Sequence, residues 1–254
     1  MQTIKQRDIA RDEIAGAEAL MAEGWPAAET RRIGEWICQL DAGVTRRANS
    51  VLPLGGTDAD PETAIVQVEA LYSTKGLPPV FKISPAACPK DLDARLAARG
   101  YREEGHALVL GRPIVGAETA PQVPVRLEDR LTPLWAEICH GTEPGRAVRD
   151  AIVGRIRRPH RFALAEADGE AAAAGLGVVL DDWLLITALV TRPALRRRGA
   201  ARAVIAALAG FAAGSGARRL ILQVERDNLP ARSLYAGLGW AQLYSYAYRV
   251  RCAV

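Results

Sequence analysis

Three consecutive arginines followed by a glycine and two alanines form the segment of this sequence with the clearest chemistry. The segment is Arg196-Arg197-Arg198-Gly199-Ala200-Ala201, and it joins an apolar strand pattern to an alanine-rich helix pattern. The first backbone amides of a helix lack intrahelical acceptors and carry the positive end of the helix dipole. The glycine removes a side chain where the backbone must approach a ligand, and arginines add bidentate donors. Together these features predict a site for a diphosphate group.

The same segment also fits a plainer interpretation, which is a basic helix start with an alanine-rich body. Arginines at a helix N-terminus oppose the helix dipole, at a cost of roughly a few tenths of a kcal/mol each, unless an anion lies between them. That conflict favours a bound anion. The segment is not a P-loop, because no Gly-Lys-Ser or Gly-Lys-Thr follows it. From this segment alone the identity of the ligand stays open.

A second segment carries the pattern Asn-x-x-Ala-x-x-Leu-Tyr-x-x-x-Gly-Trp, which runs from Asn228 to Trp240. By residue type alone, Asn228 suits the cap of a helix that begins at Leu229, and Tyr235 suits a core position. Together and in this order, the two segments resemble the GNAT (GCN5-related N-acetyltransferase) superfamily. The resemblance covers residues 125–250. More loosely, segments 47–50 and 77–83 resemble a two-domain bacterial subfamily.

The resemblance implies a site for acetyl-CoA. In the superfamily, the strand before the arginine loop offers backbone groups to the acyl carbonyl and the pantetheine arm, and here that strand ends at 189–191. The amides from Arg197 to Arg202 would bind the diphosphate, with Arg196 at the first motif position and Ala201 in place of a second glycine. The predicted cofactor-binding residues are Leu189, Val190, Thr191, Arg196, Arg197, Arg198, Gly199, Ala200, Ala201, Arg202, Asn228, Ala231 and Tyr235.

The resemblance also implies the reaction, an acetyl transfer to a primary amine by direct attack. Tyr235 matches the tyrosine that protonates the leaving thiolate, and Asn228 matches an asparagine that contacts the cofactor arm. A lysine-like amine is almost fully protonated at pH 7, and supplying it neutral costs about 4.6 kcal/mol. Either a base takes the proton or the site desolvates the amine. Glu225 is the first candidate because it ends the strand beside the proposed acyl site; Asp181, Asp182 and His140 are weaker ones.

The sequence predicts an α/β (α+β) fold of tandem GNAT-like mixed central sheets flanked by helices. A proline- and glycine-rich stretch at 111–124 predicts a linker with a boundary near residue 120. The predicted domains are a degenerate GNAT-like half, 1–115, without a cofactor site, and an acetyltransferase half, 124–254. Residues 92–101 can be aligned with 231–240, which places Leu96 where Tyr235 stands. Duplication and chance similarity both account for that alignment.

Hydrophobic periodicity predicts the elements of both halves. Helices are predicted at 11–23, 61–75, 90–99, 133–138, 146–156, 200–213 and 230–237. Strands are predicted at 33–40, 44–52, 80–84, 101–110, 125–127, 161–166, 171–179, 183–191, 220–224 and 243–250. The first two strands are expected to form a hairpin around residues 41–43. Tyr244, Tyr246 and Tyr248 alternate along the last strand and are given no catalytic role.

Composition narrows the class of protein. The net charge of +4 is too weak by itself to indicate nucleic acid, and the basic run 155–161 lacks the interleaved aromatic residues that stack on bases. No apolar run reaches the roughly 18 residues that a membrane span needs, and the cysteines and histidines show no metal-ligand spacing. We expect a cytoplasmic monomer or homodimer acting on a small-molecule or protein amine, with no nucleic acid, membrane or metal partner. A non-catalytic acyl-CoA sensor and a nucleic-acid-binding protein are the alternatives.

Overall fold

The computed structural model describes residues 4–114, 123–142 and 144–251. The chain divides into two compact units. Unit 1 comprises Met1–Leu110 and Gln223–Val254, and unit 2 comprises Gly111–Leu222. Residues 223–254 thus group with the first half of the chain, whereas the predicted domains place them with the second half. The predicted boundary near residue 120 lies outside the described residues.

Unit 1 contains most of one mixed sheet and four helices. Its strands are β1 (Lys5–Gln6), β2 (Glu29–Ile33), β3 (Trp36–Leu40), β4 (Val51–Leu52), β5 (Val80–Ile83), β6 (Arg102–Pro113) and β12 (Ala241–Val250). Its helices are α1 (Arg11–Glu23), α2 (Pro61–Ser73), α3 (Leu92–Ala98) and α7 (Leu229–Gly237), with a 3-10 turn η1 (Arg46–Ala48). The last residues of β6, from Gly111 on, belong to unit 2.

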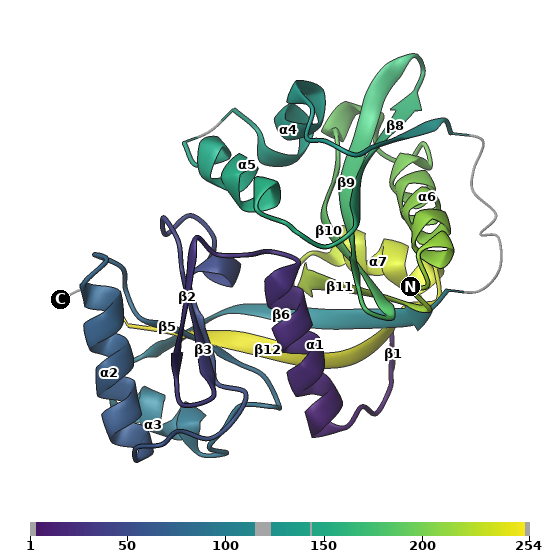
Figure 1. Cartoon of the computed structure of the whole chain (residues 1–254). Coiled ribbons are helices and arrows are strands. Elements are labelled where there is room, and N and C mark those ends of the chain that lie inside the picture. The colour runs from purple at the N-terminus through teal and green to yellow at the C-terminus, as the bar shows by residue number, and fades with distance from the viewer. Residues whose placement is uncertain (1–3, 115–122, 143, 252–254) are drawn as a thin grey trace. The chain divides into compact units, whose positions relative to one another are not determined.

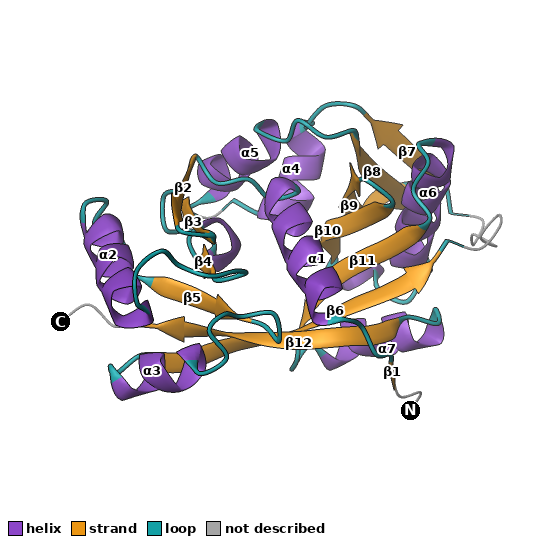
Figure 2. Ribbon diagram, turned by 60° about the horizontal axis from the view of Figure 1, so that its bottom comes forward, coloured by secondary structure: helices purple, strands orange, loops and turns teal. Residues whose placement is uncertain are grey.

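The strand order in unit 1 places the end of the chain in the middle of this sheet. The order is β2-β3-β4-β5-β12-β6, and β1 pairs with β12. Strand β12 runs antiparallel to β5, with Ala247 opposite Ile83 and Val250 opposite Val80. Figure 2 shows β12 as a long strand between β5 and β6. The last strand of the sequence therefore completes the sheet that the first half begins.

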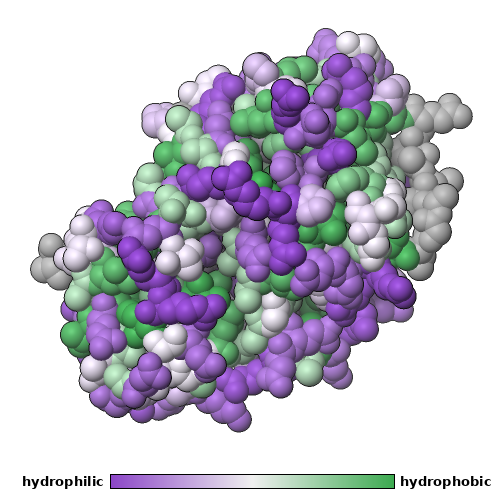
Figure 3. Space-filling view, in the orientation of Figure 1, coloured by the Kyte–Doolittle hydropathy of each residue, from purple (hydrophilic) through white to green (hydrophobic). Residues whose placement is uncertain are grey.

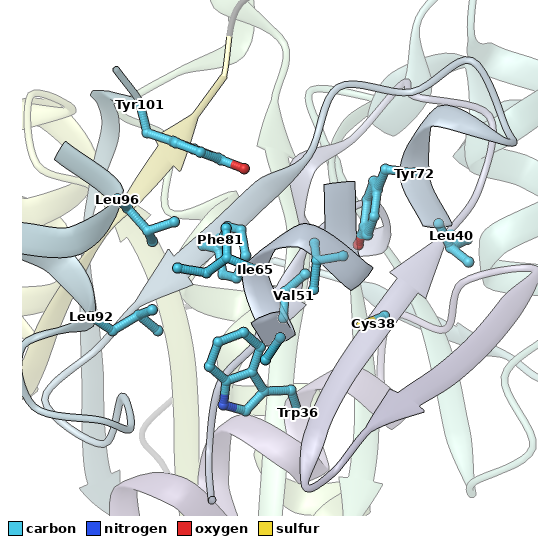
Figure 4. Close-up of a cluster of buried hydrophobic side chains, with 12 residues drawn as sticks. Trp36, Cys38, Leu40, Val51, Ile65, Tyr72, Phe81, Leu92, Leu96 and Tyr101 are labelled. Carbon is cyan, nitrogen blue, oxygen red and sulfur yellow. The ribbon is translucent and has the colours of Figure 1, made fainter. Parts of the chain in front are cut away.

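The core of unit 1 is an apolar cluster that α2 and α3 close (Figure 4). Trp36 and Tyr101 each meet Phe81 edge to face, with ring centres 5.7 Å apart. The Tyr72 hydroxyl, at the end of α2, donates a 2.8 Å hydrogen bond to the backbone carbonyl of Gln39. This bond satisfies a polar group that burial would otherwise leave without a partner.

The ends of α3 and α7 share one hydrogen-bond pattern. The Tyr101 amide donates to the Leu96 carbonyl at 3.0 Å, and the Trp240 amide donates to the Tyr235 carbonyl at 3.1 Å. The glycine before each aromatic residue has positive φ, +83° at Gly100 and +75° at Gly239. The alignment that places Leu96 at the position of Tyr235 therefore agrees with the local geometry.

All seven predicted helices are present among the described residues. The predicted segments 33–40 and 44–52 do pair antiparallel, as β3 and β4, but the second strand is only Val51–Leu52 and the tight turn predicted at 41–43 is wrong. A tight turn lies instead between β2 and β3, at Gly34, where φ is +56° and an added Cβ would lie 2.6 Å from the Thr57 Cα. Residues 41–49 form a loop because the Asn49 side chain accepts hydrogen bonds from the Asp41 and Gly43 amides. Asparagine side chains compete in this way with the hydrogen bonds of a strand.

Unit 2 contains an antiparallel sheet extended by one parallel strand. Its strands are β7 (Val125–Glu128), β8 (His160–Ala167), β9 (Glu170–Leu180), β10 (Trp183–Thr191) and the start of β11 (Arg219–Glu225). Its helices are α4 (Pro133–His140), α5 (Arg146–Gly154) and α6 (Ala200–Gly214), with a 3-10 turn η2 (Pro193–Leu195). The strand order is β11-β10-β9-β8-β7. Residues 111–113 continue β6, so the predicted linker begins too early.

Helix α6 packs on the sheet of unit 2 through small residues (Figure 1). Its buried face includes Ala203, Val204 and Leu208. Opposite this face, a Cβ at Gly175 would lie 2.9 Å from Val204 Cγ1, and one at Gly177 would lie 2.9 Å from Leu208 Cδ2. Strand β9 therefore lets the helix approach closely because two of its residues lack side chains.

The surface mixes polar and apolar residues. On the face in Figure 3, hydrophilic and hydrophobic residues are interspersed. Among the described residues, the large hydrophobic side chains that are exposed are Val66, Leu127 and Leu229, each on a different element. In the part of the chain that the structure describes, no helix combines the length and the apolar character that crossing a membrane requires.

Substitution of the β9 glycines tests this packing. We expect Gly175→Ala and Gly177→Ala each to lower the free energy of unfolding by about 1–3 kcal/mol, because the added methyl group overpacks the α6 interface. Gly210→Ala is the matched control: its Cβ would meet nothing within 4 Å, and it lies inside α6, so we expect a gain of roughly 0.5–1 kcal/mol. Urea unfolding of the three variants measures this, and equal effects at all three glycines would contradict the packing argument.

Candidate functional site

Strand β10 changes its pairing where the predicted acyl site begins. Its parallel register with β11 runs from Trp183 opposite Arg219 to Ile186 opposite Leu222. Its antiparallel register with β9 shifts between Thr187 and Val190, and Ala188 has φ +50°. A bulge of this kind bends the strand and re-aims its backbone groups. Residues 188–191 are half-buried, whereas residues 183–187 of the same strand are buried.

A cysteine side chain contacts this bulge. Cys139 Sγ, at the end of α4, donates a hydrogen bond of 3.1 Å to the Ala188 carbonyl oxygen. Burial raises the pKa of the Cys139 thiol, so it stays protonated and keeps donating. Because the carbonyl of one peptide and the amide hydrogen of the same peptide point in opposite directions, this contact also orients the Leu189 amide. The sequence did not indicate this residue, since no spacing relates α4 to the bulge.

The loop after β10 turns through two left-handed residues before α6. Arg197 has φ +67°, and Gly199, the N-cap of α6, has φ +82°. A positive φ at a non-glycine residue costs about 1 kcal/mol or more and is found most often at functional sites. Alternation of this kind turns successive amides into one concave surface that suits anions. The loop therefore has a turn of the kind that suits an anion, and that it holds a diphosphate remains a prediction.

The N-terminus of α6 offers backbone amides without a side-chain cap. No side chain caps Gly199, and the first backbone hydrogen bond of the helix runs from the Ala203 amide to the Gly199 carbonyl. The amides of 200–202 therefore precede the first intrahelical donor. Ala200 is buried, and Ala201 and Gly199 are half-buried, and none of the three carries a large side chain of its own.

The arginines of the loop differ in what they contact. Arg196, Arg197 and Arg202 are exposed. Arg198 forms an ion pair with Asp168, at the turn between β8 and β9. Arg192, just before the loop, donates a 2.7 Å hydrogen bond to Glu137. Arg198 therefore already has an acidic partner within unit 2, which sequence spacing could not reveal.

The second predicted segment lies in unit 1, at the start of α7. Asn228 is the N-cap of this helix, and its side chain accepts a 3.2 Å hydrogen bond from the Ala231 amide. The prediction that Asn228 caps this helix is thus confirmed, and the Ala231 amide is the donor that the cap satisfies. The Asn228 side chain still has its amide group for other partners, since only the oxygen makes this bond.

Tyr235 lies in the middle of α7, with 7% of its surface exposed. Its ring lies 5.6 Å from that of Trp240, at 58°. Burial raises the pKa of Tyr235 to about 12. The hydroxyl therefore carries its proton throughout the neutral range, as a general acid must.

The four base candidates have different surroundings. Glu225, the last residue of β11, is exposed. Asp181 pairs with Arg158 at 3.0 Å, and Asp182 pairs with Arg219 at 2.8 Å. His140 is buried, with its Nδ1 atom 2.6 Å from Asp150, and burial lowers its pKa. Among the four, Glu225 is the exposed carboxylate for which the structure shows no ion pair.

The structure groups the predicted site residues in two sets. Residues 189–191 and 196–202 belong to unit 2, whereas Glu225, Asn228, Ala231 and Tyr235 belong to unit 1. The first set lies on the end of β10, the loop after it and the start of α6, and the second set lies on the end of β11 and on α7. That both sets serve a single ligand remains a prediction from the family pattern.

The sequence of this chain is similar to known acetyltransferase sequences. Residues 12–249 match a family model described as "Probable histone acetyltransferase Rv0428c C-terminal". The chain is also 31% identical over 250 residues to a protein of Bacillus subtilis (strain 168) named "Uncharacterized N-acetyltransferase YobR". That alignment covers 94% of this chain and 99% of the relative. The chain belongs to the GNAT superfamily.

Solved structures of this superfamily share the fold of the acetyltransferase. A GCN5-related N-acetyltransferase from Kribbella flavida has a TM-score of 0.73 at 15% identity, with 97% of each chain covered. A tandem GNAT protein from the clavulanic acid biosynthesis pathway has a TM-score of 0.64 at 13% identity, with 96% of each chain covered. The mixed α/β fold and the N-acetyltransferase class predicted from the sequence are confirmed.

The strained turn of this acetyltransferase can be tested without any ligand. Replacing Arg197 by glycine removes the cost of its positive φ, so we expect Arg197→Gly to leave the free energy of unfolding unchanged or raise it by up to about 1 kcal/mol. Arg196→Gly is the matched control, because Arg196 is also exposed and has a φ of −67°, and it should lose about 1 kcal/mol. Urea unfolding measures both, and equal losses would show that the turn carries no strain.

Proposed function

We propose that the protein transfers an acetyl group from acetyl-CoA to a primary amine of a small molecule or a protein. The observation that carries this proposal is the left-handed turn at Arg197 and Gly199, which leads from a bulged strand into an uncapped helix start. An uncapped helix start with small residues at its first turn suits a diphosphate. Membership of the superfamily supports coenzyme A as the molecule that carries it.

The residues of the loop fit this cofactor in charge and in shape. The amides of 197–202 would hold the diphosphate, with the exposed side chains of Arg196, Arg197 and Arg202 around it. Arg198 is engaged by Asp168, so we assign it a structural part in the loop. The half-buried backbone of 189–191 would meet the pantetheine arm, in the manner of an added strand. Acetyl-CoA supplies an activated thioester when bound.

Two side chains are proposed to move the protons. Glu225 takes the proton that the amine loses as the bond between its nitrogen and the acyl carbon forms. Tyr235 gives its hydroxyl proton to the sulfur as the carbon–sulfur bond breaks, and solvent returns a proton to Tyr235. The thiolate has an ordinary pKa near 8.5, so its protonation by Tyr235 gives a modest gain. The larger requirement is the neutral amine, which costs about 4.6 kcal/mol for a lysine-like acceptor.

Binding of acetyl-CoA is expected to stabilise the protein. At a ligand concentration 100 times the dissociation constant, the stabilisation is about 2.7 kcal/mol, which a thermal melt resolves. We expect a micromolar dissociation constant, and Gly199→Val should weaken it at least tenfold because a side chain would enter the cradle. If millimolar acetyl-CoA does not raise the melting temperature of the wild type, the cofactor assignment is wrong.

Substitution of Tyr235 distinguishes binding of acetyl-CoA from its turnover. We expect Tyr235→Phe to bind acetyl-CoA as the wild type does and to release free thiol at least tenfold more slowly, since the ring stays and the proton is lost. Thiol release with a panel of amines measures this, with the melting temperature as the control for folding. Unchanged turnover would remove Tyr235 from the mechanism. A wild type that binds acetyl-CoA and releases no thiol with any amine would instead favour a sensor.

A further inference from the structure

The bulge in β10 places two residues opposite one. Ala188 and Leu189 of β10 both lie opposite Gly175 of β9, because the register between the two strands shifts there. The register of β10 with β11 ends before the bulge, at Ile186. Backbone groups at such a bulge lie outside the regular ladder, and buried backbone groups need hydrogen-bond partners. Partners for these groups must therefore come from another element.

Helix α4 supplies those partners from one of its faces. The Trp135 indole Nε1 donates a 3.0 Å hydrogen bond to the Gly175 carbonyl, and Cys139 Sγ donates one of 3.1 Å to the Ala188 carbonyl. Residues four apart lie on the same face of a helix, one turn from each other. One face of α4 therefore satisfies one carbonyl group on each strand of the bulge.

A third side chain of α4 holds the far end of the same segment. The Glu137 carboxylate accepts a 2.7 Å hydrogen bond from the Arg192 guanidinium. Residues 188–191 thus run between two attachments to α4. The ion pair at Arg192 is partly exposed to solvent, and such pairs contribute little by themselves. The orientation of the segment therefore depends mainly on the contact at Ala188.

The peptide between Ala188 and Leu189 needs this contact because its backbone is strained. Ala188 has φ +50°, which costs about 1 kcal/mol or more at a residue with a side chain. Gly175 leaves room for the bulge, since a Cβ there would lie 3.2 Å from Leu189 Cδ1 and 3.8 Å from Leu189 Cα. The hydrogen bond from Cys139 offsets part of the strain, because any relaxation that turns the Ala188 carbonyl away breaks this bond.

Cys139 is suited to be a fixed donor and not to covalent chemistry. Its side chain is half-buried, and burial raises the pKa of its thiol. The thiolate is the nucleophilic form of cysteine, so a thiol that keeps its proton is unreactive. The same proton is the one that the Ala188 carbonyl accepts.

We propose that Cys139 is a positioning residue for acyl transfer, which aims the Leu189 amide at the carbonyl oxygen of the bound thioester. The inference rests on the proposed function, since that oxygen belongs to acetyl-CoA. The Ala188 carbonyl points at α4, so the Leu189 amide, in the same peptide plane, points away from α4. As the amine nitrogen bonds to the acyl carbon, an electron pair of the carbonyl moves onto its oxygen, and it returns as the carbon–sulfur bond breaks. A donor already aimed at this oxygen stabilises the charge on it.

Substitution of Cys139 tests this role through kcat, measured as thiol release with an amine that the wild type acetylates. We expect Cys139→Ala to lower kcat about tenfold and to change the KM of acetyl-CoA less than about threefold, because a misaimed donor matters most in the transition state. Cys139→Ser keeps a donor at this position, so its kcat should lie within about threefold of the wild type.

Cys38→Ala is the matched control for packing. Cys38 is 0% exposed in the core of unit 1, so the same truncation lowers stability without a change at the bulge. We expect its kcat to equal that of the wild type. If Cys139→Ala does not fold, Cys139→Val removes the donor in its place. An undiminished kcat in the variant without a donor overturns the proposal, and so does a loss that Cys139→Ser does not restore.

The infrared stretch of the acetyl carbonyl tests the same contact without turnover. Isotope labelling of that carbonyl isolates its stretch in bound acetyl-CoA, and a donated hydrogen bond lowers the frequency. We expect a lower frequency than in free acetyl-CoA for the wild type and Cys139→Ser, and a smaller lowering for Cys139→Ala. If acetyl-CoA stabilises the wild type against heat but its carbonyl stretch is unchanged, the positioning role is wrong and the proposed function survives. Absence of thermal stabilisation contradicts both.

Discussion

Close contact between α6 and β9 is the interaction on which the rest of unit 2 depends. Gly175 and Gly177 lack side chains where Val204 and Leu208 of the helix meet the strand. The helix can therefore lie close to the sheet, and its start follows directly from the end of β10. A bulkier residue at either glycine would lift α6 and move its first amides away from the turn at Gly199. The geometry of the loop at Gly199 therefore depends on the packing of Val204 and Leu208, which lie more than one helical turn further along α6.

Unit 1 depends on a different constraint, which is the return of the last strand. Strand β12 fills the place between β5 and β6, so the sheet begun by the first half is closed by the end of the chain. Two of the tyrosines that alternate along β12, Tyr244 and Tyr246, then meet Glu18 of α1 and Lys82 of β5. The alternating pattern indicated one face of a strand, and in the structure this face contacts a buried ion pair.

The buried ion pair of Glu18 and Lys82 adds little to the stability of unit 1 by itself. An apolar core at these two positions would be at least as stable, because desolvation offsets much of the attraction between two buried charges. The Tyr244 hydroxyl and the Tyr246 ring give both charges a further partner within unit 1.

The sequence by itself determined the helices, the strand that runs to Thr191, the arginine–glycine loop and the superfamily, because each depends on residues close together in the chain. Periodicity and caps report local structure, and the motif at Asn228 and Tyr235 lies on one short helix and its cap. The tight turn predicted at residues 41–43 was wrong because the Asn49 side chain holds a longer loop between β3 and β4, an interaction that periodicity does not register.

Only the tertiary structure decided which residues far apart in the sequence meet. The contact of Cys139 with the bulge at Ala188, the pairing of Arg198 with Asp168 and the place of β12 beside β5 all join segments that no spacing relates. The same holds for Arg47 and Lys82, whose shared surroundings depend on a loop and a strand brought together beneath α1. The sequence specifies the type of each of these side chains. Their hydrogen bonds and charge interactions depend on neighbours that come close only when the chain folds.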